Sequence, residues 1–332
     1  MCGMKIKFDP FLIALVGAVI LASVFPQPYA WDGGELLNTI SVVGVSLVFF
    51  LYGLKLKKDE VKQGLSKWRL HLQVQLATFL LFPLLVLIFY PFVNTDQQFH
   101  FWLSFFFLAV LPSTVSSSVV LVSIARGNIP ASIFNASISG LIAIVITPLW
   151  LSFFVKAQGD LDTLVIYRSL LLEIVVPMFA GFYLQRFWGG WARRNSKKLS
   201  NFDKAVVILI VYVSFADSFV SGIFNEIGWM YLSLLLLACV LLFVFIYVIL
   251  LLLSRYVFRL NYEDEITLLF CGSKKSLMHG SVFGKLLFAG NPYAGLYYLP
   301  LLVFHAMQIF IVSVIASKIG GNTLNRKLPV HK

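Results

Sequence analysis

Residues 111–140 read LPSTVSSSVVLVSIARGNIPASIFNASISG, an apolar stretch that small and polar side chains interrupt twice. Pro112 removes a backbone donor at the start of the first interruption. The first hydroxyl cluster consists of Ser113, Thr114, Ser116, Ser117 and Ser118. The second cluster, which follows the hinge at residues 125–128, consists of Ser132, Asn135, Ser137 and Ser139. Because unpaired polar groups cost several kcal/mol in lipid, these breaks are expected to line a cavity inside the protein.

An alternative interpretation is a proline kink whose hydroxyls bond back to their own helix. It explains one or two serines better than two facing clusters. Helices that are broken near the middle of the membrane are typical of the ion and substrate sites of secondary transporters.

The composition indicates a polytopic membrane protein. Of 332 residues, 59% are hydrophobic and 12% are charged, and the mean hydropathy is +0.88. Ten segments are apolar and long enough to span a bilayer, which leaves no room for a soluble domain. They cover residues 8–26, 36–54, 70–92, 101–124, 129–155, 164–187, 205–224, 229–254, 264–288 and 294–317.

The basic residues indicate the orientation of the chain. The net charge is +11, and 21 of the 26 Lys and Arg residues fall in alternate loops and in the two termini. The opposite loops hold Lys156 and Arg168. The positive-inside rule therefore predicts an integral protein of the plasma (inner) membrane with both termini in the cytoplasm, and a nucleic-acid partner is not expected.

A second interruption lies in the ninth predicted span, where residues 270–281 read FCGSKKSLMHGS. Lys274 lies about 13 Å beyond Glu265 in a helix, and each lysine at the bilayer centre costs about 2.5–3.5 kcal/mol. The lysines should therefore face water, a partner or a ligand, unless the span begins later and they are interfacial. Since successive helical residues point about 100° apart, either the helix is unwound after Gly272 or one lysine reaches toward the interface.

The two interrupted segments are the fourth and the ninth of ten predicted spans. Each is therefore the fourth of its half, and an odd number of spans per half inverts the second half relative to the first. The predicted fold is an all-α membrane protein of two inverted five-helix repeats, residues 1–155 and 156–332. Interrupted segments at matching places in two such repeats indicate a transporter binding site.

Other polar residues within spans are weaker candidates. Gln75 either faces the site or makes a helix-to-helix hydrogen bond. Glu173, Asp217, His279 and His305 are possible proton carriers. No metal-ligating spacing and no pairing of a nucleophile with a base appears, so an enzyme is not expected, nor a cofactor.

At these residues the chain resembles the bile acid:sodium symporter superfamily. It is most similar to the divergent branch that includes solute carrier family 10 member 7 and bacterial relatives. The motifs are the serines at 116–118, the Ala-Arg-Gly-Asn sequence at 125–128 and CGSKKS at 271–276. The resemblance implies a core domain of spans 3–5 and 8–10, in which broken spans 4 and 9 cross. It also implies a panel domain of spans 1, 2, 6 and 7, with the substrate between the two domains.

The resemblance implies that the sodium sites are degraded. Ser118 and Ser132 keep two ligand positions, with Asn135 beside them, but the glutamate of the first site corresponds to Phe270. The glutamine of the second site corresponds to Lys274. Lys274 is therefore expected to replace a sodium ion, or alternatively to pair with a carboxylate such as Glu265 as a structural tether.

The predicted function is secondary active transport of an organic, amphipathic anion by alternating access, coupled to sodium or protons. One alternative is cation/proton exchange, and another is a non-transporting regulator of ion (calcium) homeostasis. The expected partners are the lipid bilayer and the small-molecule substrate. The predicted binding residues are Gln75, Ser116, Ser117, Ser118, Ser132, Asn135, Ser137, Ser273, Lys274, Lys275 and Ser276.

Overall fold

The computed structural model describes residues 10–31, 34–55, 67–114, 116–155, 168, 171–289 and 291–327, and at Ser116, Val155, Glu226 and 321–327 the backbone alone. Within these ranges all regular structure is helical. Helices satisfy every backbone group internally, as an apolar chain in lipid requires. Among the described residues, five segments are long and apolar enough to cross a membrane: Glu35–Lys55, Trp68–Phe92, Ile129–Phe154, Trp229–Val257 and Ala294–Gly320. The count of ten spans and their inverted repeat stay predictions.

The chain forms two compact units. Unit 1 comprises Met1–Lys55, Arg168–Ile227 and Ser281–Tyr298. Unit 2 comprises Leu56–Tyr167, Gly228–Gly280 and Leu299–Lys332. Two helices, α15 (Leu277–Leu287) and α16 (Ala294–Lys327), contribute residues to both units.

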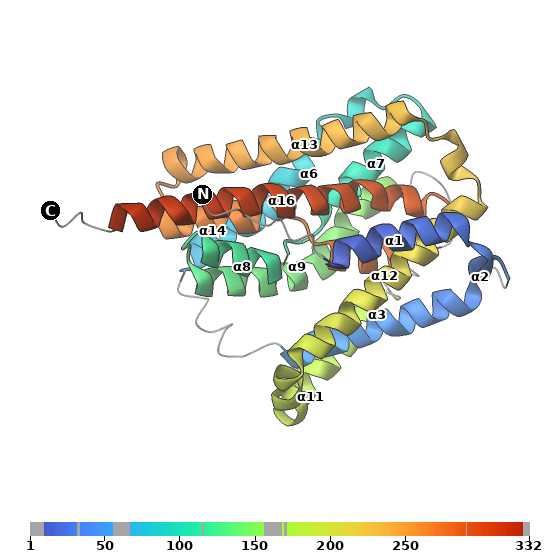
Figure 1. Cartoon of the computed structure of the whole chain (residues 1–332), viewed down its shortest axis with the longest axis horizontal. Helices are drawn as coiled ribbons and strands as arrows, with labels where there is room; N and C mark the ends of the chain where they lie inside the picture. Colours follow the sequence, from blue (N-terminus) through green and yellow to red (C-terminus); the bar gives the residue numbers. More distant parts are fainter. Residues whose placement is uncertain are drawn as a thin grey trace. The chain divides into compact units, whose positions relative to one another are not determined.

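Unit 1 is built around close contact between two helices, α3 and α11. Its elements are α1 (Pro10–Val24), α2 (Gln27–Ala30), α3 (Glu35–Lys55), the π-helical turn η5 (Leu171–Val175), α11 (Val176–Arg194), α12 (Ser196–Val220) and η6 (Ile223–Glu226). α3 packs along α11, and α1 packs along α12 (Figure 1). A Cβ atom added at Gly53 would collide with the backbone oxygen of Met178, and one at Gly181 with that of Phe50. Small residues let helix backbones approach this closely in membranes.

We expect Gly181→Leu to lower the free energy of unfolding of the protein by about 3 kcal/mol, because the side chain must separate α3 from α11. Thermal unfolding in detergent measures the loss. Gly17→Leu is the matched control, since a Cβ atom at this helical glycine meets nothing within 4 Å. Equal stability of the two variants would contradict the backbone contact.

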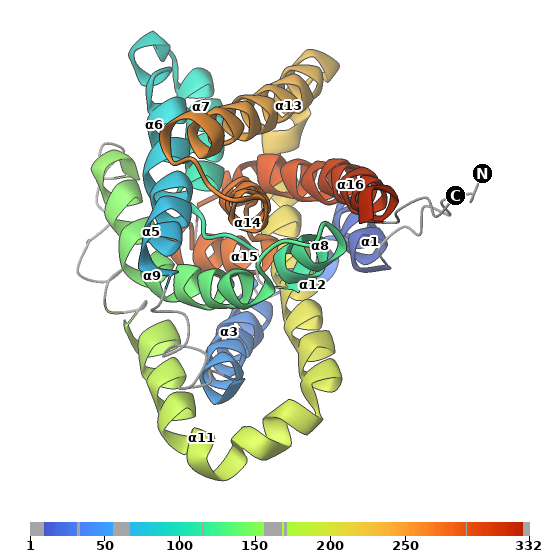
Figure 2. The same cartoon turned by 90° about the vertical axis from the view of Figure 1, so that its left-hand side faces the viewer.

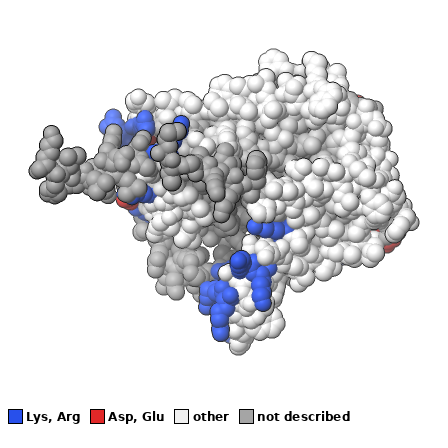
Figure 3. Space-filling model, in the orientation of Figure 1, with Lys and Arg blue, Asp and Glu red and all other residues white. Residues whose placement is uncertain are grey.

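Basic side chains gather where α11 meets α12. Figure 3 shows Lys and Arg concentrated at this end of the helical pair. The exposed residues are Arg186, Arg193, Arg194, Lys197 and Lys198. They belong to the predicted cytoplasmic loops, and their side of the membrane stays a prediction.

Unit 2 surrounds the short helix α14. Its elements are α5 (Trp68–Leu76), η2 (Ala77–Leu81), α6 (Phe82–Leu87), η3 (Tyr90–Phe92), α7 (Asp96–Val110), α8 (Ser116–Ile124), α9 (Ile129–Val155), α13 (Trp229–Leu252), η7 (Leu253–Val257) and α14 (Tyr262–Gly272). α14 contacts α5, α8, α9 and α13 (Figure 2). Its residues 266–272 are buried with no exception, which requires neighbours on every side of the helix.

Both predicted interruptions are present. α7 ends at Val110 and α8 begins at Ser116, while α14 ends at Gly272 and α15 begins at Leu277. The predicted hinge at 125–128 separates α8 from α9, and Arg126 adopts a left-handed φ of 59° there. The structure therefore has two unwound segments, both of which place polar groups inside unit 2.

Candidate functional site

The two unwound segments form reciprocal hydrogen bonds with each other. The hydroxyl of Ser113 donates to the carbonyl of Cys271 at 2.5 Å, in the last turn of α14. In return, the backbone N–H of Ser276 donates to the carbonyl of Pro112 at 2.8 Å. Terminal carbonyls of a helix have no partner within it, so each break provides donors for the other. The alternative in which the first serines bond only to their own helix is therefore wrong for Ser113.

A chain of hydrogen bonds runs from Lys274 through the first hydroxyl cluster. The ammonium of Lys274 donates to Ser117 Oγ at 3.3 Å, and Ser117 donates to Thr114 Oγ1 at 2.8 Å. Thr114 and Ser118 share the next bond at 2.8 Å, and Ser118 donates to the carbonyl of Phe270 at 3.3 Å. The chain thus joins a buried cation to the C-terminal end of α14, which carries partial negative charge.

The second cluster approaches the same end of α14 from α9. Ser132 Oγ lies 3.4 Å from Cys271 Sγ, and both residues are buried. Asn135 donates to the carbonyl of Ala131 at 3.1 Å and accepts from Gln75 Nε2 at 3.2 Å. Gln75 therefore makes the helix-to-helix bond that was one of its two interpretations. Its Oε1 atom is buried with no hydrogen-bond partner among the described residues.

The adjacent lysines have different surroundings. Both have side chains with no exposed surface, and their depth in the membrane stays a prediction. Lys275 Nζ donates to the carbonyls of Thr78, Ala109 and Leu111, at 2.7, 2.6 and 2.8 Å. Within the described part of the chain, Lys274 Nζ makes a single hydrogen bond, to a hydroxyl. An ammonium has three N–H donors. All three donors of Lys275 are hydrogen-bonded, whereas Lys274 uses one of its three within the described part of the chain.

Lys274 is not tethered to Glu265. The carboxylate of Glu265 forms an ion pair with Arg255 at 3.1 Å and accepts a bond from Ser254 at 3.4 Å. In the described ranges no carboxylate forms an ion pair with either buried lysine. The tether interpretation is corrected for a geometric reason: Glu265 lies in the first turn of α14, whereas Lys274 lies beyond the other end of this helix.

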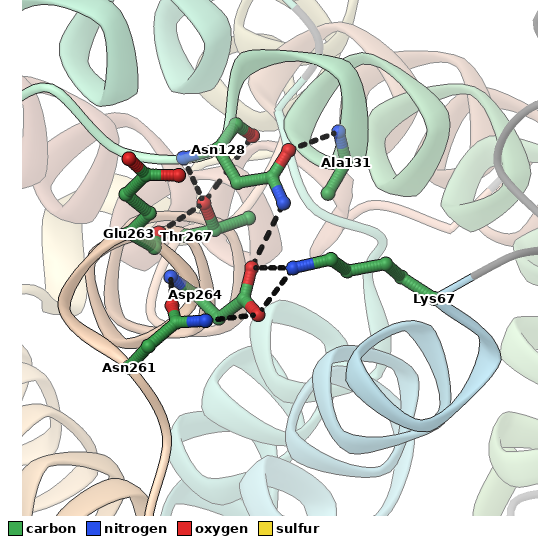
Figure 4. Close-up of polar contacts among 7 residues, drawn as sticks. All are labelled: Lys67, Asn128, Ala131, Asn261, Glu263, Asp264 and Thr267. Carbon is green, nitrogen blue, oxygen red and sulfur yellow. Dashed lines mark hydrogen bonds and ion pairs between the residues drawn. The ribbon is translucent and has the colours of Figure 1, made fainter.

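Sequence reasoning missed a polar cluster at the other end of α14, formed by Lys67, Asn128, Asn261, Asp264 and Thr267 and called the Asp264 cluster here (Figure 4). The carboxylate of Asp264 accepts from Lys67 at 2.6 and 2.9 Å, from Asn128 at 2.8 Å and from Asn261 at 3.2 Å. Thr267 Oγ1 accepts from the backbone N–H of Asn128 at 3.0 Å. The available signal was Asn261 three residues before Asp264, the pattern of a helix N-terminus.

The remaining predicted residues of unit 2 have local partners. Ser137 and Ser273 donate to carbonyls four residues earlier, at 3.0 and 2.6 Å, as the back-bonding interpretation predicts. Ser276 caps α15 by accepting from the backbone N–H of His279 at 3.3 Å, and its hydroxyl lies 2.9 Å from Nδ1 of the same histidine. His305 Nδ1 lies 3.0 Å from Gln308 Nε2. Ser116 begins α8, and its side chain lies outside the described part.

The two carboxylates proposed as proton carriers belong to unit 1. Glu173 lies in η5, and its Oε2 atom is buried without a hydrogen-bond partner among the described residues. Asp217 lies in α12 and hydrogen-bonds with Tyr29 and Ser221. Lys285 of α15 donates to Asn38 Oδ1 and attracts both carboxylates electrostatically. Lys285 was not among the predicted site residues.

The family assignment rests on nearly the whole length of the chain. A sequence model of the SBF-like CPA transporter family matches residues 9–320. The chain belongs to this family. It is a membrane transporter related to the bile acid:sodium symporters and not an enzyme, as the motifs at 116–118, 125–128 and 271–276 predicted.

Relatives of this SBF-like transporter occur in bacteria and vertebrates. An uncharacterized protein of Pseudomonas aeruginosa is 36% identical over 313 residues, 93% of this chain and 92% of the relative. YfeH of Escherichia coli, named as a candidate symporter, is 35% identical over 319 residues, 95% and 94% of the two chains. Sodium/bile acid cotransporter 7 of Rattus norvegicus is 28% identical over 333 residues, 97% and 96% of the two chains.

Proposed function

We propose that this SBF-like transporter is a secondary active transporter that moves an organic, amphipathic anion by alternating access, with the ammonium of Lys274 in place of a sodium ion. The observation that carries the proposal is the environment of Lys274. The side chain is fully buried, has no ion-pair partner among the described residues and keeps unused donors. A buried cation without a counter-charge is costly, so an anionic ligand would stabilise this arrangement.

The kind of anion is suggested by the relatives. Vertebrate relatives, that of Rattus norvegicus among them, carry the name sodium/bile acid cotransporter 7, and bile acids combine an anionic group with a large apolar body. Ser117 and Thr114 would provide further polar contacts next to Lys274. We therefore take a conjugated bile acid as the probe for transport assays.

The oxygen atoms near Lys274 do not favour a sodium ion. Ser118 is engaged with Thr114 and Phe270, and Asn135 Oδ1 accepts from Gln75. The residue at the position of the symporters' glutamate is Phe270, and a fixed ammonium repels a second cation. Proton coupling fits this site better than sodium coupling.

We expect uptake of taurocholate into proteoliposomes to continue when sodium is replaced by choline. The physical reason is that the tethered ammonium supplies the positive charge that sodium supplies elsewhere. The measurement is the initial uptake rate in the presence of a preset proton gradient. Protein-free liposomes are the control. If uptake falls to the level of protein-free liposomes in choline, a sodium site exists and the role given to Lys274 is wrong.

A second candidate function is cation/proton exchange through unit 1. It is favoured by the buried Oε2 of Glu173, which has no hydrogen bond to any residue that the structure describes, and by Lys285, which attracts Glu173 and Asp217. Dye measurements of luminal pH after addition of sodium or potassium to the same liposomes would detect exchange.

Counterflow of taurocholate in these liposomes also separates a transporter from a non-transporting regulator, because a regulator gives no substrate-dependent uptake.

A further inference from the structure

Lys275 lies in a cage of backbone oxygens. Its ammonium donates to three carbonyls at 2.6–2.8 Å, distances typical of charge-assisted hydrogen bonds. It also lies 4.1 Å from the ring centroid of Phe82, within the range of a cation–π contact. No surface of Lys275 is exposed. These contacts use every donor of the ammonium.

The first carbonyl of the cage, that of Thr78, is free because of a π-helical turn and a proline. In η2 the backbone N–H of Phe82 bonds to Ala77, five residues back, and so passes over Thr78. The next residue, Pro83, has no N–H to offer. The carbonyl of Phe79, which Pro83 also leaves free, accepts from the indole of Trp150 at 2.9 Å. Lys275 provides the donor that the carbonyl of Thr78 lacks within its own helix.

The other two carbonyls lie at the end of α7. Pro112 lacks a backbone donor, and the N–H of Ser113 bonds to Ser139 Oγ at 3.1 Å, so neither continues the helix. The carbonyls of Ala109 and Leu111 accept from Lys275 instead. The C-terminal end of a helix carries partial negative charge, so a cation placed there stabilises the helix.

The backbone of Lys275 is held in place from α16. Gln308 Oε1 accepts from the backbone N–H of Lys275 at 2.8 Å, and Gln308 Nε2 donates to its carbonyl at 2.7 Å. Gln308 has no exposed surface. These two hydrogen bonds fix the backbone of the unwound segment at Lys275. The position of the Lys275 side chain is therefore fixed as well.

We infer that the carbonyls of Thr78, Ala109 and Leu111 with the ring of Phe82 form a site for a monovalent, ammonium-like cation, which Lys275 occupies permanently. The residue acts as a built-in ion that stabilises the break between α7 and α8, whereas Lys274 faces the hydroxyl cluster. Removing the side chain should leave a vacant site of the right chemistry for free ammonium. This role of Lys275 stabilises the fold and does not depend on the transported substrate.

The test is chemical rescue of Lys275→Ala. We expect this variant to unfold roughly 10 °C below the wild type in detergent, because three buried carbonyls lose their donor. Ammonium chloride should raise the unfolding temperature by several degrees in a saturable manner. Tetramethylammonium chloride at equal concentration should not, because it has no N–H donor and is too large. Measurements at pH 7 keep free ammonium protonated.

Two further variants make the result decisive. Lys274→Ala is the matched control, and ammonium should not change its stability more than that of the wild type. Lys275→Gln keeps donors without the charge and should be intermediate in stability. The inference is overturned if Lys275→Gln is as stable as the wild type, or if both cations act equally on Lys275→Ala. It is also overturned if neither Lys275 variant can be recovered when ammonium is present throughout purification.

Discussion

Lys274→Met should reduce the initial rate of taurocholate uptake by roughly 100-fold, since a charged hydrogen bond to the substrate contributes about 1.5–3 kcal/mol. Methionine keeps the length and the apolar stem of lysine but removes the ammonium. Because the ammonium of Lys274 is buried with a single hydrogen bond among the described residues, its loss should not lower stability. Uptake per reconstituted protein and the unfolding temperature, measured together, separate a transport defect from misfolding.

The controls for this prediction test charge and location. Lys274→Arg keeps the cation and should retain part of the uptake, although its planar guanidinium has a different geometry. Lys197→Met removes an exposed lysine of α12 and should have no effect. Uptake by Lys274→Met within twofold of the wild type would show that the ammonium does not contact the anion.

Asp264→Ala should lower the free energy of unfolding by about 3 kcal/mol. The buried carboxylate accepts from Asn128 and Asn261, and bonds to a charged acceptor contribute about 1.5–3 kcal/mol each before relaxation. Lys67 adds little, because 43% of its side chain is exposed and solvent screens the pair. Without the carboxylate, the N-terminal ends of α5, α9 and α14 lose the polar contact that Lys67, Asn128 and Asp264 form there (Figure 4).

Thermal and urea unfolding in detergent measure this effect. Glu263→Ala is the matched control, because this exposed acid precedes Asp264 in the same turn of α14. Lys67→Met should cost less than about 1 kcal/mol. A stability loss for Lys67→Met as large as that for Asp264→Ala would mean that the ion pair, and not the amide bonds, holds the cluster together.

The sequence by itself determined the class of the protein and the places where its helices stop. High hydropathy and long apolar runs leave helices as the structure that pairs every backbone group in lipid, so the all-helical fold followed from composition. Pro112 with the following serines, and Gly272 with the following lysines, predicted both interruptions because these residues remove donors or add groups that lipid cannot solvate. The family motifs in the same stretches predicted a transporter.

Only the tertiary structure decided what each polar group near the interruptions does. Lys274 and Lys275 are adjacent and chemically identical, and their different roles depend on the carbonyls of Thr78 and Ala109, which are far away in sequence. The role of Asp264 could not be predicted from local sequence either, because two of its partners, Lys67 and Asn128, lie far away in the sequence, just before α5 and α9. Local sequence records which backbone groups are left without partners within a helix. Packing then selects the side chain that satisfies them, because a hydrogen bond requires two groups within about 3 Å of each other.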